Sequence, residues 1–363
     1  MQIAVQNAYL STWIFTILLI IIVIFSMRKK HDDGLLTLSV TQELKGFAIL
    51  TVIFCHIGYF LATDSQFLFP LSIMSGVGVD IFLFLSGFGL TMSALAKNIS
   101  VFGFYKKHLS KIYIPLWIIL AIFFTLSFFV SHIGYSSSYI LKSFTGIFTS
   151  ADIYKDINSP LWFITAIVFY YLLFPIFFSK KYPWISAIII FLCSFAIVKS
   201  NPSILAGVMN LYQVHILAFP VGMLYAWVLS QPNISTYIKH FLANLRPPIY
   251  YFFIFLIIFV IGYLAYFSGV GKGIFWQSCI SMITTLAVIK LFIMKQVRIN
   301  LFYVLGLYSF EIYLLHWPIL YHYDVFYHYL PAWLATISYL GLFLVLGFLL
   351  KKVSDQILTI FFK

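Results

Sequence analysis

The chain has 363 residues, of which 63% are hydrophobic and only 9% are charged. Soluble domains carry about 25% charged residues, so this composition excludes a soluble globular protein and indicates an integral membrane protein. The formal net charge of +12 is typical of a membrane protein whose basic loops face anionic lipids. We therefore expect membrane lipids, and no nucleic acid, among its partners.

Continuous apolar runs of about 20 residues predict membrane-spanning helices. Residues 17–25 are apolar without interruption, whereas a strand of a membrane β-barrel alternates apolar and polar residues. We predict an all-α, polytopic helical bundle of about 11 transmembrane helices. The fourth span follows a basic loop (residues 104–111) and ends near residue 131, and the other spans cover residues 8–27, 43–61, 76–95, 160–178, 184–198, 212–229, 249–267, 274–292, 303–321 and 332–350.

The positive charges support this count, because a missed or invented span would scramble the alternation of loop charge. Of the 22 Lys and Arg residues, 17 fall on one side, 4 on the other, and Lys45 sits within a span. The rule predicts an N-terminus outside and a C-terminus in the cytoplasm. The three cysteines lie singly in apolar runs, with no spacing typical of a metal or redox motif. We therefore predict no metal site.

Two ionisable residues share one face of the second span. Lys45 and His56 are eleven residues apart, which brings them within about 20° of each other around the helix and separates them by about 16 Å along it. Ionisable groups inside a membrane are costly, usually face a bundle interior or a wet cavity, and indicate function by default. We interpret this helix as the working part of the protein.

The predicted spans also place other polar residues at defined depths. His56, Asp80 and His316 all lie roughly 6–8 Å below the outer surface, while Glu311 lies about one and a half turns deeper than His316. Lys45 and a cluster formed by Lys106, Lys107 and Lys111 mark the cytoplasmic side. The residues alone leave structural roles open. Either histidine could form a hydrogen bond between helices, Asp80 could orient a histidine or pair with a lysine, and Glu311 could be a structural partner of Lys45. The lysine cluster could be simple loop charge.

Five segments resemble the membrane acyltransferase type 3 family. Lys45 and His56 resemble its signature of a basic residue, ten residues and His, in which Arg is more usual at the first position. The other four segments follow in the order of the family: Gly78–Phe88 is similar to Gly-Val-Asp-x-Phe-Phe-x-Leu-Ser-Gly-Phe, Phe104–Pro115 to a basic loop that ends near a Pro, Leu161–Ile164 to a Leu-Trp-Phe element, and Gly306–Pro318 to Gly-x-x-Ser-x-x-x-Tyr-Leu-x-His.

The resemblance implies an architecture and a location. Family members usually have ten core spans, so residues 1–41 are expected to form an extra N-terminal transmembrane helix with a basic cytoplasmic loop. Residues 42–363 are expected to form the membrane acyltransferase domain. The expected location is a bacterial plasma membrane.

The resemblance also implies transfer of an acyl group, most often acetyl from acetyl-CoA, to a hydroxyl of a cell-surface glycan or its lipid-linked precursor. A neutral imidazole suits the base that takes the hydroxyl proton, which we assign to His56, with Asp80 or His316 as its orienting partner. An acyl-histidine intermediate on His56 is the alternative route. Lys106, Lys107 and Lys111, with Lys45 above them, are expected to hold the donor phosphates, and we expect no permanently bound cofactor.

A transporter or flippase of an anionic or glycolipid substrate is the alternative function, because the same polar residues could line a path. Transporters tend to contain internal repeats, and the two halves of this sequence contain no convincing one. The sequence therefore favours the enzyme.

Overall fold

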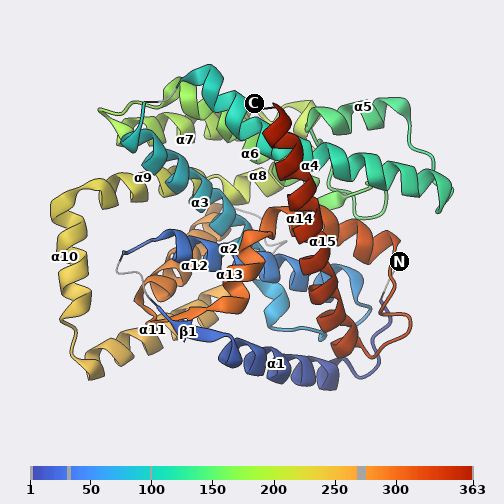
Figure 1. The fold of residues 1–363 in the computed structure, drawn as a ribbon, viewed down its shortest axis with the longest axis horizontal. Helices are drawn as coiled ribbons and strands as arrows, with labels where there is room; N and C mark the ends of the chain where they lie inside the picture. The colour runs from blue at the N-terminus through green and yellow to red at the C-terminus, as the bar shows by residue number, and fades with distance from the viewer. Residues whose placement is uncertain (1–2, 31–33, 99, 268–274, 362–363) are drawn as a thin grey trace.

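A computed structural model describes residues 3–30, 34–98, 100–267 and 275–361, and helices make up most of this part of the chain (Figure 1). The α-helices are α1 Ala8–Phe25, α2 Leu38–Cys55, α3 Ser75–Ala96, α4 Val101–Phe129, α5 Ser137–Thr145, α6 Trp162–Phe177, α7 Pro183–Ser200, α8 Met209–His215, α9 Ala218–Ser230, α10 Pro232–Ala243, α11 Pro247–Phe267, α12 Phe275–Met294, α13 Asn300–Leu307, α14 Ser309–His322 and α15 Ala332–Phe361. Shorter elements are the π-helix η1 His56–Leu61, the 3-10 helices η2 Leu71–Ile73, η3 Ser159–Leu161 and η4 Ser203–Leu205, and the strands β1 Met27–Lys29 and β2 Val297–Ile299.

Within the described ranges, ten helices are long and apolar enough to cross a membrane, which confirms the predicted all-α polytopic fold. The expected span that is missing from these ten covers residues 303–321, and here the structure differs from the prediction. It is broken at Tyr308 into α13 and α14, each shorter than a spanning helix. The break allows α13 and α14 to take different directions, so that α13 follows α2 while α14 packs on α15 as well as α2.

Two pairings join segments that are far apart in sequence. Strand β1 pairs antiparallel with β2, Met27 opposite Ile299, and Ile3 forms a backbone bridge with Ala62. In the predicted topology, β1 and β2 both lie on the inner side, and Ile3 and Ala62 both lie on the outer side. Both pairings therefore agree with the predicted number of crossings between their segments.

Helix α2 and its continuation η1 form the centre of the bundle. The side chain of Thr37 caps the first turn of α2 by accepting a hydrogen bond from the backbone N–H of Val40. Most of the span Leu38–Leu61 is buried, and α2 packs extensively against α3 and α13 and less extensively against α12 and α14. This packing lets the ionisable residues of the span meet partners on neighbouring elements.

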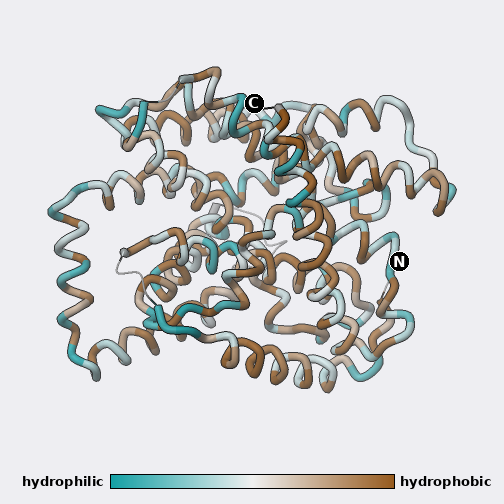
Figure 2. Tube along the Cα trace, in the orientation of Figure 1, coloured by the Kyte–Doolittle hydropathy of each residue, from teal (hydrophilic) through white to brown (hydrophobic). Residues whose placement is uncertain are grey.

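The periphery of the bundle is built differently. Helix α11 is almost entirely exposed and packs on α12. Figure 2 shows that both α11 and α1 consist mainly of apolar residues. Helix α10 begins with Pro232 at its first turn, buries none of its side chains, and lies at the edge of the molecule, across the direction of α1 (Figure 1). Its mixed polar and apolar surface is typical of a helix that lies in the membrane interface.

An ion pair fixes the predicted inner end of α2. Glu43, which is 1% exposed, accepts hydrogen bonds from Lys295 Nζ at 2.5 Å and from the backbone N–H of Ile299 at 2.6 Å. Burial lowers the pKa of the Lys295 amine, and the hydrogen bond and charge of Glu43 act in the opposite direction. The carboxylate thus links α2 to strand β2, and β2 in turn holds β1 at the end of α1.

Two glycines let α2 and α13 approach until their backbones touch. A Cβ atom on Gly46 would overlap the carbonyl oxygen of Phe302, and one on Gly306 would overlap the carbonyl oxygen of Gln42. Small residues at such crossings are what allows close packing of membrane helices. Gly306 is also the first residue of the segment Gly306–Pro318 that resembles the family. The close contact with α2 explains why a glycine is needed at this position.

We predict that Gly46→Ala and Gly306→Ala each lower the stability of the protein, because the added methyl group meets backbone that cannot rotate away. Overpacking of this kind costs about 1–3 kcal/mol or more, and thermal unfolding in detergent should show a lower midpoint for both variants. Gly89→Ala is the control, since nothing lies within 4 Å of its added Cβ. Equal midpoints for all three variants would contradict the close packing.

Candidate active site

His56 stands at the point where α2 changes from an α-helix to the π-helical turn η1. Single π-helical turns inside α-helices are uncommon and occur frequently at functional sites. The wider turn rotates the residues that follow His56. His56 itself is partly exposed, although the adjacent residues Cys55 and Ile57 are buried. The ring is surrounded by Phe60 and Trp317, whose centroids lie 5.9 and 5.1 Å from its own.

A second histidine holds the ring of His56. His56 Nδ1 lies 2.6 Å from Nε2 of His316, and the two rings are nearly parallel, with centroids 4.9 Å apart. His316 Nδ1 faces two carbonyl oxygens, that of Tyr313 at 2.8 Å and that of Ile312 at 3.2 Å. The sequence predicted that His56 and His316 lie at the same depth below the outer surface, and in the structure the two side chains are in contact.

The hydrogen bonds assign the tautomers of both rings. Carbonyl oxygens only accept, so Nδ1 of His316 carries the proton, and its Nε2 in the neutral ring accepts. Nδ1 of His56 must then be the donor in the 2.6 Å contact. Nε2 of His56 is left without a proton, so the neutral ring presents a base.

This base borders a cavity of about 330 Å³. The cavity contains aromatic rings and several polar groups but no acidic side chain among its described lining, and α2, η1, α3, α6, α8, α12 and α14 contribute to it. Its polar and aromatic lining includes His56, Phe60, Ser75, Trp162, Phe163, Asn210, His215, Gln277 and Tyr313. Trp162 and Phe163 come from the predicted Leu-Trp-Phe element, which the structure therefore places beside His56.

Asp80 has partners that the sequence did not identify. Its Oδ1 lies 2.8 Å from Nδ1 of His215, and its Oδ2 accepts a hydrogen bond from Ser281 Oγ. All three side chains are buried. Asp80 and His316 were the two candidates for the partner of His56. In the structure His316 contacts His56, whereas Asp80 pairs with His215.

The predicted depths contained a signal for His215. It lies three residues into the expected span 212–229, in the same outer layer as His56, Asp80 and His316. Applying the depth estimate to every histidine would have placed it in the candidate group. Its pairing with Asp80, in contrast, depends on the packing of α8 against α3, which the sequence does not encode in any short pattern.

The deeper charged residues form a separate cluster near the predicted inner side. Glu311 Oε1 lies 3.8 Å from Lys351 Nζ, and Lys45 is within electrostatic range of both. The expected pairing of Glu311 with Lys45 is thus shared with Lys351 of α15. A cavity of about 470 Å³ at the ends of α13 and α15 is lined by Lys351 and Lys352.

The predicted basic loop is wrong in its secondary structure, because residues 101–111 are the first turns of α4. Ser100 caps this helix by accepting from Gly103 N, and His108 stacks on Phe104 at 4.4 Å. Residues 101–111 contain no proline, so the capped helix extends past the membrane. The three lysines of the cluster are exposed on it: Lys106, Lys107 and Lys111.

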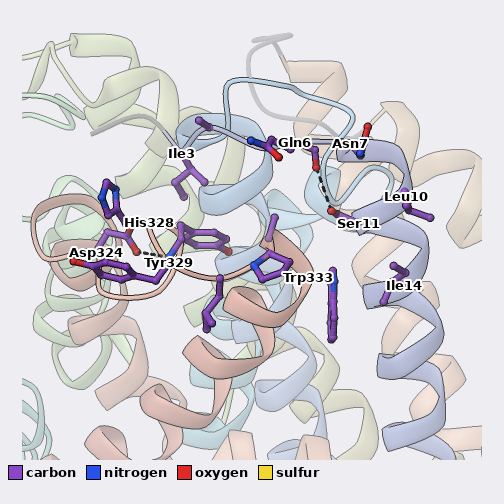
Figure 3. Close-up of a pocket in the computed structure, with 15 residues that line it drawn as sticks. Ile3, Gln6, Asn7, Leu10, Ser11, Ile14, Asp324, His328, Tyr329 and Trp333 are labelled. Atoms are coloured by element: carbon purple, nitrogen blue, oxygen red, sulfur yellow. Dashed lines mark hydrogen bonds between the residues drawn. The ribbon is translucent and has the colours of Figure 1, made fainter.

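A further cavity of about 590 Å³ opens on the predicted outer side. Figure 3 shows Gln6, Asn7 and Ser11 on one wall, near the start of α1, and His328, Tyr329 and Trp333 among the residues of the other wall. Ile3, which also lines this cavity, is bonded to the end of η1. The aromatic and amide groups could hold a ligand that offers both apolar faces and hydroxyls.

The described residues contain no group of three or more His, Cys, Asp or Glu side chains that could hold a metal ion. The three cysteines are free thiols, and Cys55 is buried directly before His56. The cavity lining includes two imidazoles, His56 and His215, and imidazoles suit proton transfer.

Comparison with known proteins agrees with this chemistry. A family model described as an acyltransferase domain matches residues 44–352, a range that contains His56, His215 and His316 and excludes α1. No curated protein and no solved structure matches the chain. Because the family model covers most of the sequence, the chain belongs to the membrane acyltransferase type 3 family and is a multi-pass membrane acyltransferase.

Proposed function

We propose that the protein is an O-acyltransferase of a bacterial plasma membrane. It takes an acyl group, most simply acetyl, from acyl-CoA on the cytoplasmic side and transfers it to a hydroxyl of a cell-surface polysaccharide or of a lipid-linked glycan precursor. The observation that carries the proposal is the unprotonated Nε2 of His56 at the edge of the 330 Å³ cavity. A base is what an acceptor hydroxyl needs when it attacks a thioester.

The contact with His316 supports general-base chemistry. The bond from His56 Nδ1 to His316 fixes both the tautomer and the plane of the ring, so the base does not have to reorient before it takes the proton. We assign catalysis to His56, with His316 as the positioning residue. Nothing in this arrangement requires an acyl-histidine, although the same Nε2 could also act as a nucleophile.

The basic groups of the predicted inner side support a donor with phosphates. Lys106, Lys107 and Lys111 project from the start of α4, while Lys45 and Lys351 lie inside near Glu311. Lysines bind phosphate as point charges. The exposed cluster would hold the diphosphate of CoA, and Lys45 would stand between it and the cavity.

The outer cavity supports a glycan acceptor. Tyr329 and Trp333 offer flat apolar surfaces, and Gln6 and Asn7 offer amides that can bond to hydroxyls. Pockets of this mixed kind fix the orientation of a ligand with a few polar groups and bury it on aromatic rings. An acceptor held there would be close to η1, since Ile3 N donates to the carbonyl of Leu61.

We predict that His56→Ala lowers acyl transfer by about 10²–10⁴-fold, because a general base contributes that much to the rate. The measurement is the transfer of radiolabelled acetyl from acetyl-CoA to surface glycan in membranes that contain equal amounts of each protein. His132→Ala, at an exposed position on the predicted outer side, should keep full activity. No label with the wild type, in a host that supplies the acceptor, would favour the transporter instead.

We predict that His316→Gln lowers the rate by roughly 10–100-fold, the effect usual for residues that orient a histidine. Because the two histidines act as a unit, the double variant with His56→Ala should be no slower than His56→Ala alone. His322→Gln, at the end of the same helix α14, is the control. Wild-type activity of His316→Gln would show that the contact does not orient the base.

We predict that changing Lys106, Lys107 and Lys111 together to Gln raises the KM for acetyl-CoA about tenfold or more, with kcat nearly unchanged. The change removes charge that binds the donor equally before and during reaction, and such uniform binding affects KM. The control replaces Lys180 and Lys181, exposed lysines on the same predicted side. An unchanged KM would move the donor site away from α4.

A further inference from the structure

A second imidazole borders the same cavity as His56. His215 is the last residue of α8 and is 6% exposed. We propose that His215 is a second catalytic residue, which carries a proton on both ring nitrogens with Asp80 as its counter-charge, and whose Nε2–H donates a hydrogen bond to the carbonyl oxygen of the thioester as negative charge develops there. This proposal rests on the proposed acyl-transfer function and assigns the group that stabilises its transition state.

The geometry around His215 fixes which nitrogen is available. Nδ1 lies 2.8 Å from Oδ1 of Asp80 and therefore donates to the carboxylate. Ser281 Oγ donates to the other carboxylate oxygen, so both oxygens of Asp80 are occupied. Trp162 lies over the imidazole with centroids 5.7 Å apart and planes inclined by 18°. The ring is thus held on its edge and on its face, and Nε2 has no protein partner in the described structure.

A purely structural role explains this arrangement poorly. A buried ionisable pair contributes little net stability, because desolvation offsets the attraction, and apolar residues of the same volume often do as well. Here three polar side chains from α3, α8 and α12 converge next to a cavity that already contains a base. Burying them at that place has a clear use if the imidazole acts on a bound molecule.

The two histidines differ in the charge of their supports. The chain behind His56 runs through His316 to backbone carbonyls and is neutral throughout. The chain behind His215 ends on the carboxylate of Asp80, which can serve as the counter-charge of an imidazole that carries a proton on both nitrogens. In one cavity, therefore, the neutral chain suits His56 to accept a proton, and the carboxylate suits His215 to donate a hydrogen bond.

His215 also stands between two cavities. Besides the cavity it shares with His56, it lines a smaller, mostly apolar one of about 110 Å³ together with Trp162, Tyr170 and Ile216. An acyl group whose carbonyl oxygen faces His215 Nε2 could place its methyl end in the apolar cavity. The acceptor hydroxyl would then approach from the side of His56.

The reaction balances with these two residues. The hydroxyl proton moves to Nε2 of His56, the hydroxyl oxygen bonds to the thioester carbon, and the carbonyl electron pair moves onto the oxygen that His215 contacts. When the carbonyl re-forms, the C–S bond breaks, and the thiolate takes the proton from His56. His215 donates a hydrogen bond throughout and ends the cycle in its initial protonation state.

The test uses the purified full-length protein in lipid nanodiscs, with acetyl-CoA and a glycan extract that the wild type acetylates. We expect His215→Gln to lower kcat by about 10²-fold, the effect of removing one donor to a developing oxyanion, without changing the KM for acetyl-CoA. Asp80→Asn should act in the same direction, and the double variant should be no slower than the slower single variant. Met209→Leu, a volume-conserving change at a buried position of the same helix, is the control.

The split between kcat and KM separates this role from a structural one. A donor to the developing oxyanion acts in the transition state alone, so its loss should lower kcat and leave the KM for acetyl-CoA unchanged, whereas a disturbed binding cavity should change the KM as well.

Each result decides between the two proposals. An active wild type, an inactive His56→Ala and a His215→Gln variant with wild-type kcat would overturn the role of His215 and leave the acyl transfer intact. A rate that falls only in proportion to the amount of folded protein would also overturn it. A wild type that transfers no acetyl group to any acceptor would instead overturn the proposed function, and this role with it.

Discussion

The structure depends on the need of every polar group inside an apolar bundle to find a partner within the protein. An ionisable side chain near the middle of a membrane costs roughly 2.5–3.5 kcal/mol on insertion scales, and no water is present to reduce that cost. The described residues meet this need in four groups, each joining helices that are distant in sequence: Glu43 with Lys295, Glu311 with Lys351 and Lys45, Asp80 with His215 and Ser281, and His56 with His316. These contacts select one arrangement among the many that apolar surfaces alone would allow.

Helix α2 takes part in three of these groups, and its packing explains why. Gly46 lets α13 touch its backbone, and the break at Tyr308 then directs α14 so that His316 meets His56. A continuous helix through residues 303–321 would have kept the direction of α13. The close glycine contact and the break together place the second histidine.

The sequence predicted the fold and the depths of the polar residues better than the contacts between them. Hydropathy and loop charge predict which segments cross the membrane as helices, because backbone groups in the membrane have no water to bond to and must form hydrogen bonds within the protein. They predicted that His56, Asp80 and His316 lie in one layer, but not that Asp80 pairs with His215. Most of these helices are apolar on all sides, so their sequence does not show which face meets which neighbour. The helical start of α4 was missed for a local reason: charge predicted a loop, whereas the cap at Ser100 and the absence of proline from residues 101–111 favour a helix.

The separation of charges with depth bears on how one site can use substrates from both sides of a membrane. Cations gather at the predicted inner end, where an anionic donor would arrive, and the imidazoles lie toward the outer end, where a hydroxyl would arrive. Between them, α2 carries Lys45 and His56 on one helix, so the two ends are held at a fixed distance along it. Under the proposed function, a thioester that reached the cavity would leave its phosphates among the lysines and meet a low dielectric at its carbonyl. In such surroundings a base and a hydrogen-bond donor would act strongly on the small charges that develop during transfer, and the two imidazoles would supply both.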